Sequence, residues 1–285
     1  MVRMQSALDV VVGLLDLESI EVNLFRGNSP DASAQRVFGG QVAGQALVAA
    51  ARTVDQPWPC HSLHAYFLRP GDPSVPILYE VDRIRDGRSF ITRRVVAIQH
   101  GKAIFNLAAS FHKDEDGFEH QAQMPDVPEP ESLPDWHEVW ASRRELIGDR
   151  IDDERSIDIR YVTAPPVDRD RPHPPRQTVW LRANGKLPSD PVLHTCLLTY
   201  ASDMTLLDTT LMPHAAGPMH PDVMMASLDH AMWFHRPLRA DEWFLYTQET
   251  PSANKGVGLA RGLVFSRGGD LVASVMQEGL IRPVR

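Results

Sequence analysis

Residues 66–70 read Tyr-Phe-Leu-Arg-Pro, and a related pattern, Trp-Phe-His-Arg-Pro, occupies residues 233–237 in the second half of the chain. Downstream of the first copy, residues 101–104 read Gly-Lys-Ala-Ile. They correspond to Gly-Asp-Leu-Val at residues 269–272, downstream of the second copy. Because both matches occur in the same order in the two halves, the chain is predicted to contain one structural unit twice.

Each copy is predicted to combine one helix with a series of strands. The stretch 39–54 is small and Ala-rich, which indicates a helix that another element approaches closely, since its glycines lack side chains. Apolar runs bounded by turn residues then predict strands at 61–68, 76–84, 90–99 and 103–112. In the second half, a helix at 191–207 precedes strands at 225–234, 242–249, 256–266 and 271–281.

A helix followed by antiparallel strands, present twice, is an α+β pattern. A long central helix wrapped by a curved antiparallel sheet is the hot-dog unit, and pairing two such units covers their exposed sheet edges. We therefore expect a double hot-dog with an N-terminal unit at 1–113 and a C-terminal unit at 151–285. The acidic, Pro-rich residues 114–150 are predicted to form a linker, with a helix at 136–147.

Composition excludes several classes of protein. The longest apolar stretches are shorter than the roughly 20 residues that span a bilayer. Residues 6–17 are predicted to form an amphipathic helix, and no secretory signal is expected at 1–17 because Asp9 and Asp16 interrupt its apolar part. The net charge of -8 argues against nonspecific nucleic-acid binding. Cys60 and Cys196 are too few for a disulfide framework, so a cytoplasmic location is expected. From the net charge and the short apolar stretches, neither nucleic acid nor a membrane is expected as a partner.

Several catalytic motifs are incomplete in this sequence. Residues 39–44 have the glycine spacing of a P-loop, but Gln45 and Ala46 stand where Lys and Ser or Thr bind phosphate and magnesium. The sequence has no Gly-x-Ser-x-Gly nucleophile elbow. A cofactor and a covalent serine intermediate are therefore not expected.

The 12 histidines raise the question of a metal site. His61 and His64 are three residues apart, and His230 and His235 are five apart. Because odd separations on a strand point to opposite faces, neither pair is expected to chelate one ion. The helical His-Glu-x-x-His motif is absent as well, so no metal is predicted.

Five ordered blocks of sequence resemble acyl-CoA thioesterase II, and the resemblance covers nearly the whole chain except the linker. In the first half they are residues 36–46, Arg-Val-Phe-Gly-Gly-Gln-Val-Ala-Gly-Gln-Ala, and residues 61–71, His-Ser-Leu-His-Ala-Tyr-Phe-Leu-Arg-Pro-Gly. In the second half they are 200–203, Tyr-Ala-Ser-Asp; 228–237, Leu-Asp-His-Ala-Met-Trp-Phe-His-Arg-Pro; and 272–279, Val-Ala-Ser-Val-Met-Gln-Glu-Gly. The resemblance implies a double hot-dog that hydrolyses fatty acyl-CoA to a fatty acid and CoA.

The same resemblance implies a catalytic set of an Asp, a Thr or Ser, and a Gln around one water. In this chain the matching positions are Asp203, Ser227 and Gln277. Ser227 replaces the commoner Thr, which keeps the hydroxyl and loses a methyl group. Alignment of the final strands places Ala109 opposite Gln277, so only one of the two units is expected to hold a working site.

The chemistry fits these residue types. A thioester carbonyl is electrophilic, so a water polarised by the Asp203 carboxylate and held by Ser227 and Gln277 suffices for attack. His61 is a weaker candidate, for which a structural hydrogen bond is the simpler interpretation. Basic candidates for the CoA phosphates are Arg69, Arg94, Arg236, Lys255 and Arg261.

Two other functions remain open from sequence. A hot-dog enoyl-CoA hydratase has a Gly-Asp-x-Asn-Pro-hydrophobic-His segment, whereas residues 71–76 read Gly-Asp-Pro-Ser-Val-Pro and lack the Asn and His. A non-enzymatic acyl-CoA sensor would keep the pocket and lose the acid, which is present here as Asp203. Because hot-dog proteins usually associate with further copies of themselves, a homodimer or homotetramer is expected.

Overall fold

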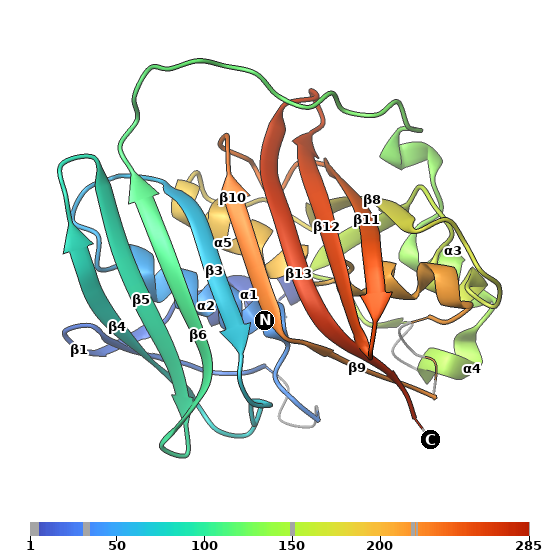
Figure 1. Ribbon diagram of the computed structural model, residues 1–285, viewed down its shortest axis with the longest axis horizontal. Coiled ribbons are helices and arrows are strands. Elements are labelled where there is room, and N and C mark those ends of the chain that lie inside the picture. The colour runs from blue at the N-terminus through green and yellow to red at the C-terminus, as the bar shows by residue number, and fades with distance from the viewer. Residues whose placement is uncertain (1–5, 31–34, 149–151, 218–219, 221, 285) are drawn as a thin grey trace, which may run out of the picture.

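The computed structural model describes residues 6–30, 35–148, 152–217, 220 and 222–284. Its strands form one antiparallel sheet, and α1, α2 and α5 lie behind that sheet in Figure 1. The first-half elements are α1 (Ala7–Leu15), β1 (Glu18–Glu21), β2 (Leu24–Gly27), α2 (Gly39–Ala51), β3 (Cys60–Phe67), β4 (Ile77–Asp86), β5 (Phe90–Gln99) and β6 (Lys102–His112).

The connecting segment contains η1 (Pro130–Ser132), α3 (Trp136–Ala141) and α4 (Arg144–Ile147). The second half contains β7 (Ile157–Tyr161), η3 (Pro166–Asp168), β8 (Arg176–Ala183), α5 (Pro191–Ser202), η4 (Leu207–His214), β9 (Val223–Ser227), β10 (Asp229–Phe234), β11 (Phe244–Asn254), β12 (Val257–Ser266) and β13 (Leu271–Pro283). No helix in this described part of the chain is long and apolar enough to cross a bilayer.

The two halves join edge to edge between β3 and β10. The strand order is β1-β2-β4-β5-β6-β3-β10-β13-β12-β11-β8-β7, so each half contributes a contiguous block of strands. At the junction the strands are antiparallel, and His64 pairs with Ala231. This arrangement confirms the expected α+β architecture, because the edge that each unit would expose alone is paired with the other unit.

Helices α2 and α5 pack closely because glycines lie between them. A Cβ atom added to Gly40 would lie 2.4 Å from the carbonyl oxygen of Tyr200. One added to Gly44 would lie 3.3 Å from the carbonyl oxygen of Cys196. The predicted close approach to the Ala-rich helix is therefore confirmed, and the element that approaches it is the central helix of the other unit.

Three predicted elements are divided in the structure. The helix expected at 191–207 ends at Ser202, and η4 begins at Leu207. The strand expected at 225–234 is interrupted at Leu228, between β9 and β10. The helix expected at 136–147 forms the two short helices α3 and α4. In addition, β1, β2, β7 and β8 were not predicted.

The Pro-rich segment after β6 runs across to the second half (Figure 1). It has no regular secondary structure from residue 113 to residue 129. The side chain of Gln121 donates to the carbonyl oxygen of Gly269 at 2.9 Å, and the Trp180 indole donates to the carbonyl oxygen of Pro128 at 3.0 Å. The segment is therefore packed against the second unit, while the division into 1–113, 114–150 and 151–285 stays a prediction.

Candidate active site

Two of the three predicted catalytic residues are in direct contact. Asp203 caps the C-terminal end of α5, and Gln277 lies in the middle of β13, where alternate residues face the core. The Gln277 side chain is fully buried, and its Nε2 donates a hydrogen bond of 2.6 Å to Oδ1 of Asp203. This hydrogen bond joins residues that are 74 positions apart in the chain. It lies on the inner face of the sheet, the face that the helices cover.

The first unit also touches Asp203, through the N-terminal end of α2. The backbone N–H of Gly40 donates a hydrogen bond to the Asp203 carboxylate. A Cβ atom added to Gly39 would lie only 2.7 Å from Oδ2 of Asp203, so the backbone approaches the carboxylate closely at this position. The carboxylate therefore lies where the helix N-terminus, with its unpaired N–H groups, favours negative charge.

The environment of Asp203 shifts its acidity. Burial raises the pKa of Asp203 from 3.8 to about 6, against the lowering effect of the hydrogen bonds from Gln277 and Gly40. The residue is still partly exposed at the surface. A carboxylate with a pKa close to the working pH is a better proton acceptor than one with an ordinary pKa.

Ser227 lies on the same inner face without a hydrogen bond to this pair. It is the last residue of β9 and pairs with Gly279, two residues beyond Gln277 on β13. Since directly paired residues share a face, Ser227 points to the same side as Gln277. Among the described residues, no hydrogen bond links its hydroxyl to Asp203 or Gln277.

Regular strand periodicity predicts that His230, three residues after Ser227, faces away from it, and this prediction is wrong. Ser227 pairs with Gly279 and Ala231 pairs with Met276, which shows a shift of one residue in the register between β9 and β10. The extra residue returns His230 to the inner face, where it is 1% exposed. Its Nε2 lies 2.9 Å from Oγ of Ser202, the residue before Asp203, and burial lowers its pKa to about 4.

His61 lies on the outer face of the sheet. Its Nε2 is 2.8 Å from Oγ of Ser110, which alternates with buried residues of β6. A register irregularity between Cys60 and Ser62 places His61 on the same face as the exposed His64. The expectation that His61 and His64 point to opposite faces is therefore wrong, because the strand is irregular there.

In the first unit a buried arginine lies beside the residue that aligns with Gln277. Ala109, which aligns with Gln277, pairs with Arg93 on β5. The buried Arg93 guanidinium donates to the Thr53 carbonyl at 3.0 Å and contacts the Asp86 carboxylate at 2.5 Å. The first unit thus has an alanine where the second unit has Gln277, and a buried arginine that pairs with Asp86 lies next to it.

Four of the five basic candidates for CoA phosphates have local partners. Arg69 and Arg236 donate to the carbonyl oxygens of Ala103 and Leu271. Arg94 and Arg261 form ion pairs with Asp82 and Glu249. These contacts lie on the sheet surface and the connecting turns, whereas the Lys255 side chain forms no ion pair or hydrogen bond with the other described residues.

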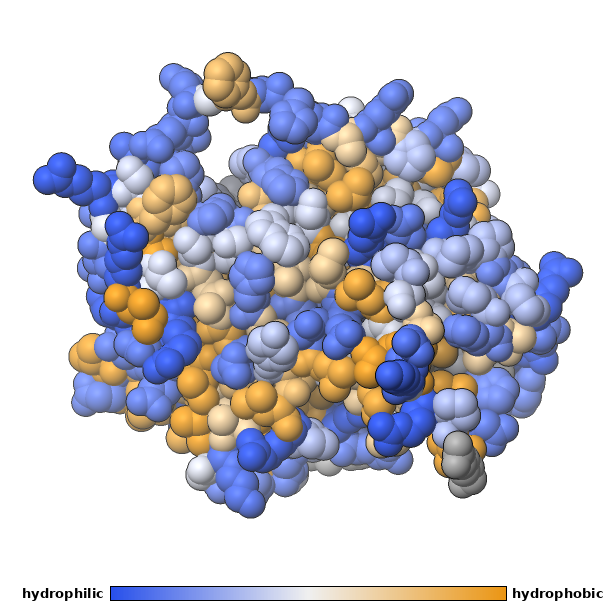
Figure 2. Space-filling view, in the orientation of Figure 1, coloured by the Kyte–Doolittle hydropathy of each residue, from blue (hydrophilic) through white to orange (hydrophobic). Residues whose placement is uncertain are grey.

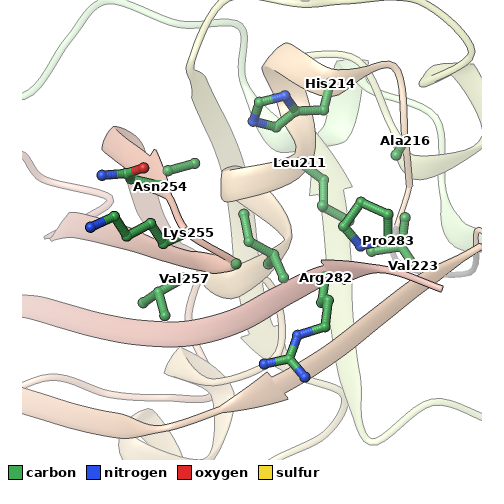
Figure 3. A pocket seen from close by; sticks show the side chains of 12 residues that line it. Leu211, His214, Ala216, Val223, Asn254, Lys255, Val257, Arg282 and Pro283 are labelled. Carbon is green, nitrogen blue, oxygen red and sulfur yellow. The ribbon is translucent and has the colours of Figure 1, made fainter. Parts of the chain in front are cut away.

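Lys255 borders a pocket of about 310 Å³ at the far end of β9 (Figure 3). The pocket lies between η4, the β11–β12 turn and the end of β13. Its lining residues are Leu211, His214, Ala216, Val223, Ala253, Asn254, Lys255, Gly256, Val257, Ile281, Arg282 and Pro283. None of the three predicted catalytic residues lines it.

Sequence reasoning missed the contributions of Gly39, Gly40, Ser202 and His230 to this region. The available signals were the Gly-Gly pair before an Ala-rich helix, and the Ser and His directly next to Asp203 and Asp229. These residues lie within the motifs that resemble acyl-CoA thioesterase II, but their spatial relation to Asp203 depends on how the two units pack.

Comparison with known proteins gives matches to both halves of the chain. The family model described as acyl-CoA thioesterase matches residues 154–280, and the acyl-CoA thioesterase N-terminal domain matches residues 28–112. Acyl-CoA thioesterase 2 from Haemophilus influenzae is 40% identical over 98% of this chain and 99% of its own. The structure of acyl-CoA thioesterase II TesB2 from Mycobacterium marinum is 45% identical, with a TM-score of 0.79, and the match covers 96% of this chain and 98% of that one.

A more distant structure agrees on the fold alone. A hot-dog protein from Alicyclobacillus acidocaldarius is 18% identical, with a TM-score of 0.79 over 97% of this chain and 99% of its own. The full-length matches at 40% identity and above, together with the two family models, show that this chain belongs to the acyl-CoA thioesterase family.

Proposed function

We propose that the protein hydrolyses fatty acyl-CoA thioesters with a water that is activated by Asp203 and held by Ser227 and Gln277. The observation that carries this proposal is the contact between the buried amide of Gln277 and the Asp203 carboxylate. The amide fixes one carboxylate oxygen, and the raised pKa makes the carboxylate basic enough to accept a proton near neutral pH.

The reaction then needs two steps. Asp203 accepts a proton from the water while the water oxygen attacks the thioester carbonyl carbon, and the carbonyl electron pair moves to its oxygen. When this oxyanion collapses, the carbon–sulfur bond breaks and the sulfur of CoA leaves with the bonding pair. The proton on Asp203 passes to that sulfur, so the products are a free fatty acid and CoA, and Asp203 is ionised again.

Backbone groups at the start of α2 are suited to stabilise the oxyanion. The first N–H groups of a helix have no partner within the helix, and Phe38 at the N-cap supplies no side-chain hydrogen bond. One of these groups, on Gly40, already bonds to Asp203. Neighbouring N–H groups of the same turn would therefore lie next to the reacting carbon, where preorganised donors are most effective.

Lys255 is our candidate for binding an anionic part of CoA. It borders an open pocket on the strand pair β9 and β13, which also carries Ser227 and Gln277. A cytoplasmic location stays a prediction, which the two unpaired thiols of Cys60 and Cys196 support.

A homodimer or homotetramer also stays a prediction. Figure 2 shows apolar groups dispersed among charged ones on the outer face of the sheet. Tyr66 on β3 is 58% exposed, and Met276 on β13 is 36% exposed. Such apolar groups at the centre of the continuous sheet would gain burial in an assembly of several copies.

The test is release of free thiol from palmitoyl-CoA. A thioesterase releases CoA with the purified protein alone, and the rate is proportional to enzyme concentration. An enoyl-CoA hydratase instead adds water to an unsaturated acyl-CoA and leaves the thioester intact, whereas a sensor binds palmitoyl-CoA and returns it unchanged. Absence of thiol release across a chain-length series would reject the proposed hydrolysis.

A further inference from the structure

Two buried glutamines of the sheet bind the turn that follows Asp203. Gln177 on β8 and Gln248 on β11 pair directly across the two strands, and they are 0% and 3% exposed. Nε2 of Gln177 donates to the carbonyl oxygen of Thr205 at 2.9 Å, and Nε2 of Gln248 donates to Oγ1 of Thr205 at 2.7 Å. Thr205 is 2% exposed and follows Asp203 by two residues, so its backbone and its side chain are both attached to the sheet.

Strand β11 also contacts the residue before Asp203. Tyr246 lies two residues before Gln248, so both side chains point to the same face of the sheet. The Tyr246 hydroxyl donates to the carbonyl oxygen of Ser202, the last residue of α5, at 3.4 Å. One strand thus binds the backbone just before Asp203 and the turn just after it.

Arg169 determines the orientation of the two amides. Its Nη2 donates to Oε1 of Gln177, and because an arginine has only donors, Nε2 of Gln177 must point the other way, to the Thr205 carbonyl. Oε1 of Gln248 accepts from Nε2 of Gln177 at 3.2 Å and from the Thr209 hydroxyl at 2.9 Å. The Thr205 carbonyl is farther from that hydroxyl, at 3.5 Å. With its oxygen occupied, Gln248 directs its Nε2 to Oγ1 of Thr205.

This network lies where a carboxylate needs support. Asp203 caps the C-terminal end of α5, and the unpaired carbonyl groups of a last helical turn disfavour negative charge. Arg169 is charged and only 3% exposed. Burying a charge lowers stability unless its interactions with water are replaced, and apolar side chains of similar size are often at least as stable. Stability alone therefore does not account for a buried arginine and two buried amides beside Asp203.

We propose that Gln248 is a positioning residue, whose hydrogen bond to Thr205 holds the turn after α5 so that the Asp203 carboxylate stays in contact with Gln277. Gln177 and Arg169 assist by fixing the orientation of the Gln248 amide. Gln248 acts through Thr205 and has no hydrogen bond of its own to the carboxylate. The effect on turnover rests on the proposed hydrolysis, in which Asp203 activates the water.

Thr205→Val tests this role because it removes the hydroxyl and keeps the branched shape of the side chain. Nε2 of Gln248 then loses its acceptor, and the turn is attached to the sheet through Gln177 alone. A catalytic group misplaced by about 1 Å costs about 10²-fold, so we expect kcat to fall by about 10- to 100-fold with little change in KM. Thr205→Ser keeps the hydroxyl and should retain most of the activity. An unchanged kcat in Thr205→Val, or an equal loss in Thr205→Ser, would overturn the positioning role.

Thr199→Val is the matched control. Thr199 is a threonine of α5 that is 0% exposed, and its hydroxyl donates to the Thr195 carbonyl of the same helix at 2.9 Å. The substitution also removes one buried hydroxyl, but it leaves the contacts between the turn and the sheet intact. Its kcat and KM should match those of the unsubstituted protein, and a loss as large as that of Thr205→Val would contradict the proposal. Urea unfolding of all variants separates a loss of folded protein from a loss of turnover.

Gln248→Met tests the same link from the sheet and decides the matter if Thr205→Val does not fold. Methionine has a similar length and cannot donate, so the same loss of kcat is expected. Crystal structures measure the geometry without using activity. The 2.6 Å hydrogen bond between Gln277 and Asp203 should be lost in Thr205→Val and Gln248→Met and kept in Thr199→Val.

An unchanged bond between Gln277 and Asp203 in Thr205→Val or Gln248→Met would refute the positioning role. Absence of thiol release from the unsubstituted protein would reject the hydrolysis alone, because the position of the carboxylate in the variants does not depend on it.

Discussion

Nε2 of Gln277 donates a hydrogen bond of 2.6 Å to Oδ1 of Asp203, which links the middle of β13 to the C-terminal end of α5. The same carboxylate accepts a hydrogen bond from the backbone N–H of Gly40 at the start of α2. Asp203 is therefore held by both units, so substitutions at the α2–α5 contact are expected to alter the position of its carboxylate.

Replacing Asp203 by Asn should remove the proton acceptor and keep the shape. We expect kcat of Asp203→Asn to fall by roughly 10²- to 10⁴-fold, the usual contribution of a positioned base, with KM nearly unchanged. Steady-state thiol release from palmitoyl-CoA measures both constants, and circular dichroism checks the fold. Activity within a few-fold of the unsubstituted protein would remove Asp203 from the mechanism.

The raised pKa of Asp203 predicts a specific pH dependence. The ionised carboxylate is the active form, so kcat/KM should be constant above the pKa of about 6 and fall about tenfold for each pH unit below it. The profile is measured in buffers of constant ionic strength. The residual activity of Asp203→Asn is the control and should lack this acidic limb, and an unsubstituted profile without the limb would contradict the assigned base.

Ser227 should act through its hydroxyl as a hydrogen-bonding group. We expect Ser227→Thr to be nearly neutral, because the hydroxyl remains and the added methyl restricts its rotation. Ser227→Ala should lose activity, but less than Asp203→Asn, since a hydrogen bond of this kind contributes about 1–3 kcal/mol.

A nucleophilic Ser227 leads to a different result. It would form a covalent acyl-enzyme and release a burst of CoA before the steady state. Mass spectrometry of protein quenched during turnover distinguishes the two mechanisms, and an acyl adduct on Ser227 would rule out direct attack by water.

Gly40 should tolerate no side chain. A Cβ atom at this position would lie 2.4 Å from the Tyr200 carbonyl oxygen, so backbone must move in Gly40→Ala. We expect a loss of about 1–3 kcal/mol in the free energy of unfolding, and reduced kcat because Asp203 shifts with the helix. Gly13→Ala in α1 is the control: no atom lies within 4 Å of a Cβ added there, so this variant should unfold at a similar or slightly higher urea concentration than the unsubstituted protein.

Activity should not depend on a metal ion. The proposed mechanism uses a carboxylate, a hydroxyl and an amide, so thiol release should be unchanged after EDTA treatment and dialysis. A loss of activity that zinc or magnesium restores would require a metal ligand set that the mechanism does not contain.

Irregularities of the backbone explain where prediction from sequence failed. Strand periodicity assigns His230 to the face opposite Ser227, and the register shift between β9 and β10 reverses that assignment. The end of α5 at Ser202 was also missed, because the apolar pattern continues into η4. Periodicity describes regular elements, and a single inserted residue changes the face of every side chain beyond it.

The sequence by itself determined the duplication, the α+β double hot-dog class and the candidate residues Asp203, Ser227 and Gln277. The duplication and the fold class follow from apolar periodicity and repeated motifs, which are local properties of the chain, whereas the three residues follow from the resemblance to acyl-CoA thioesterase II. Only the tertiary structure decided that Gln277 contacts Asp203, that Gly40 donates to the same carboxylate, and that the buried Arg93 lies beside Ala109 in the first unit. These relations depend on strand pairing and helix packing between distant segments, which no local pattern encodes.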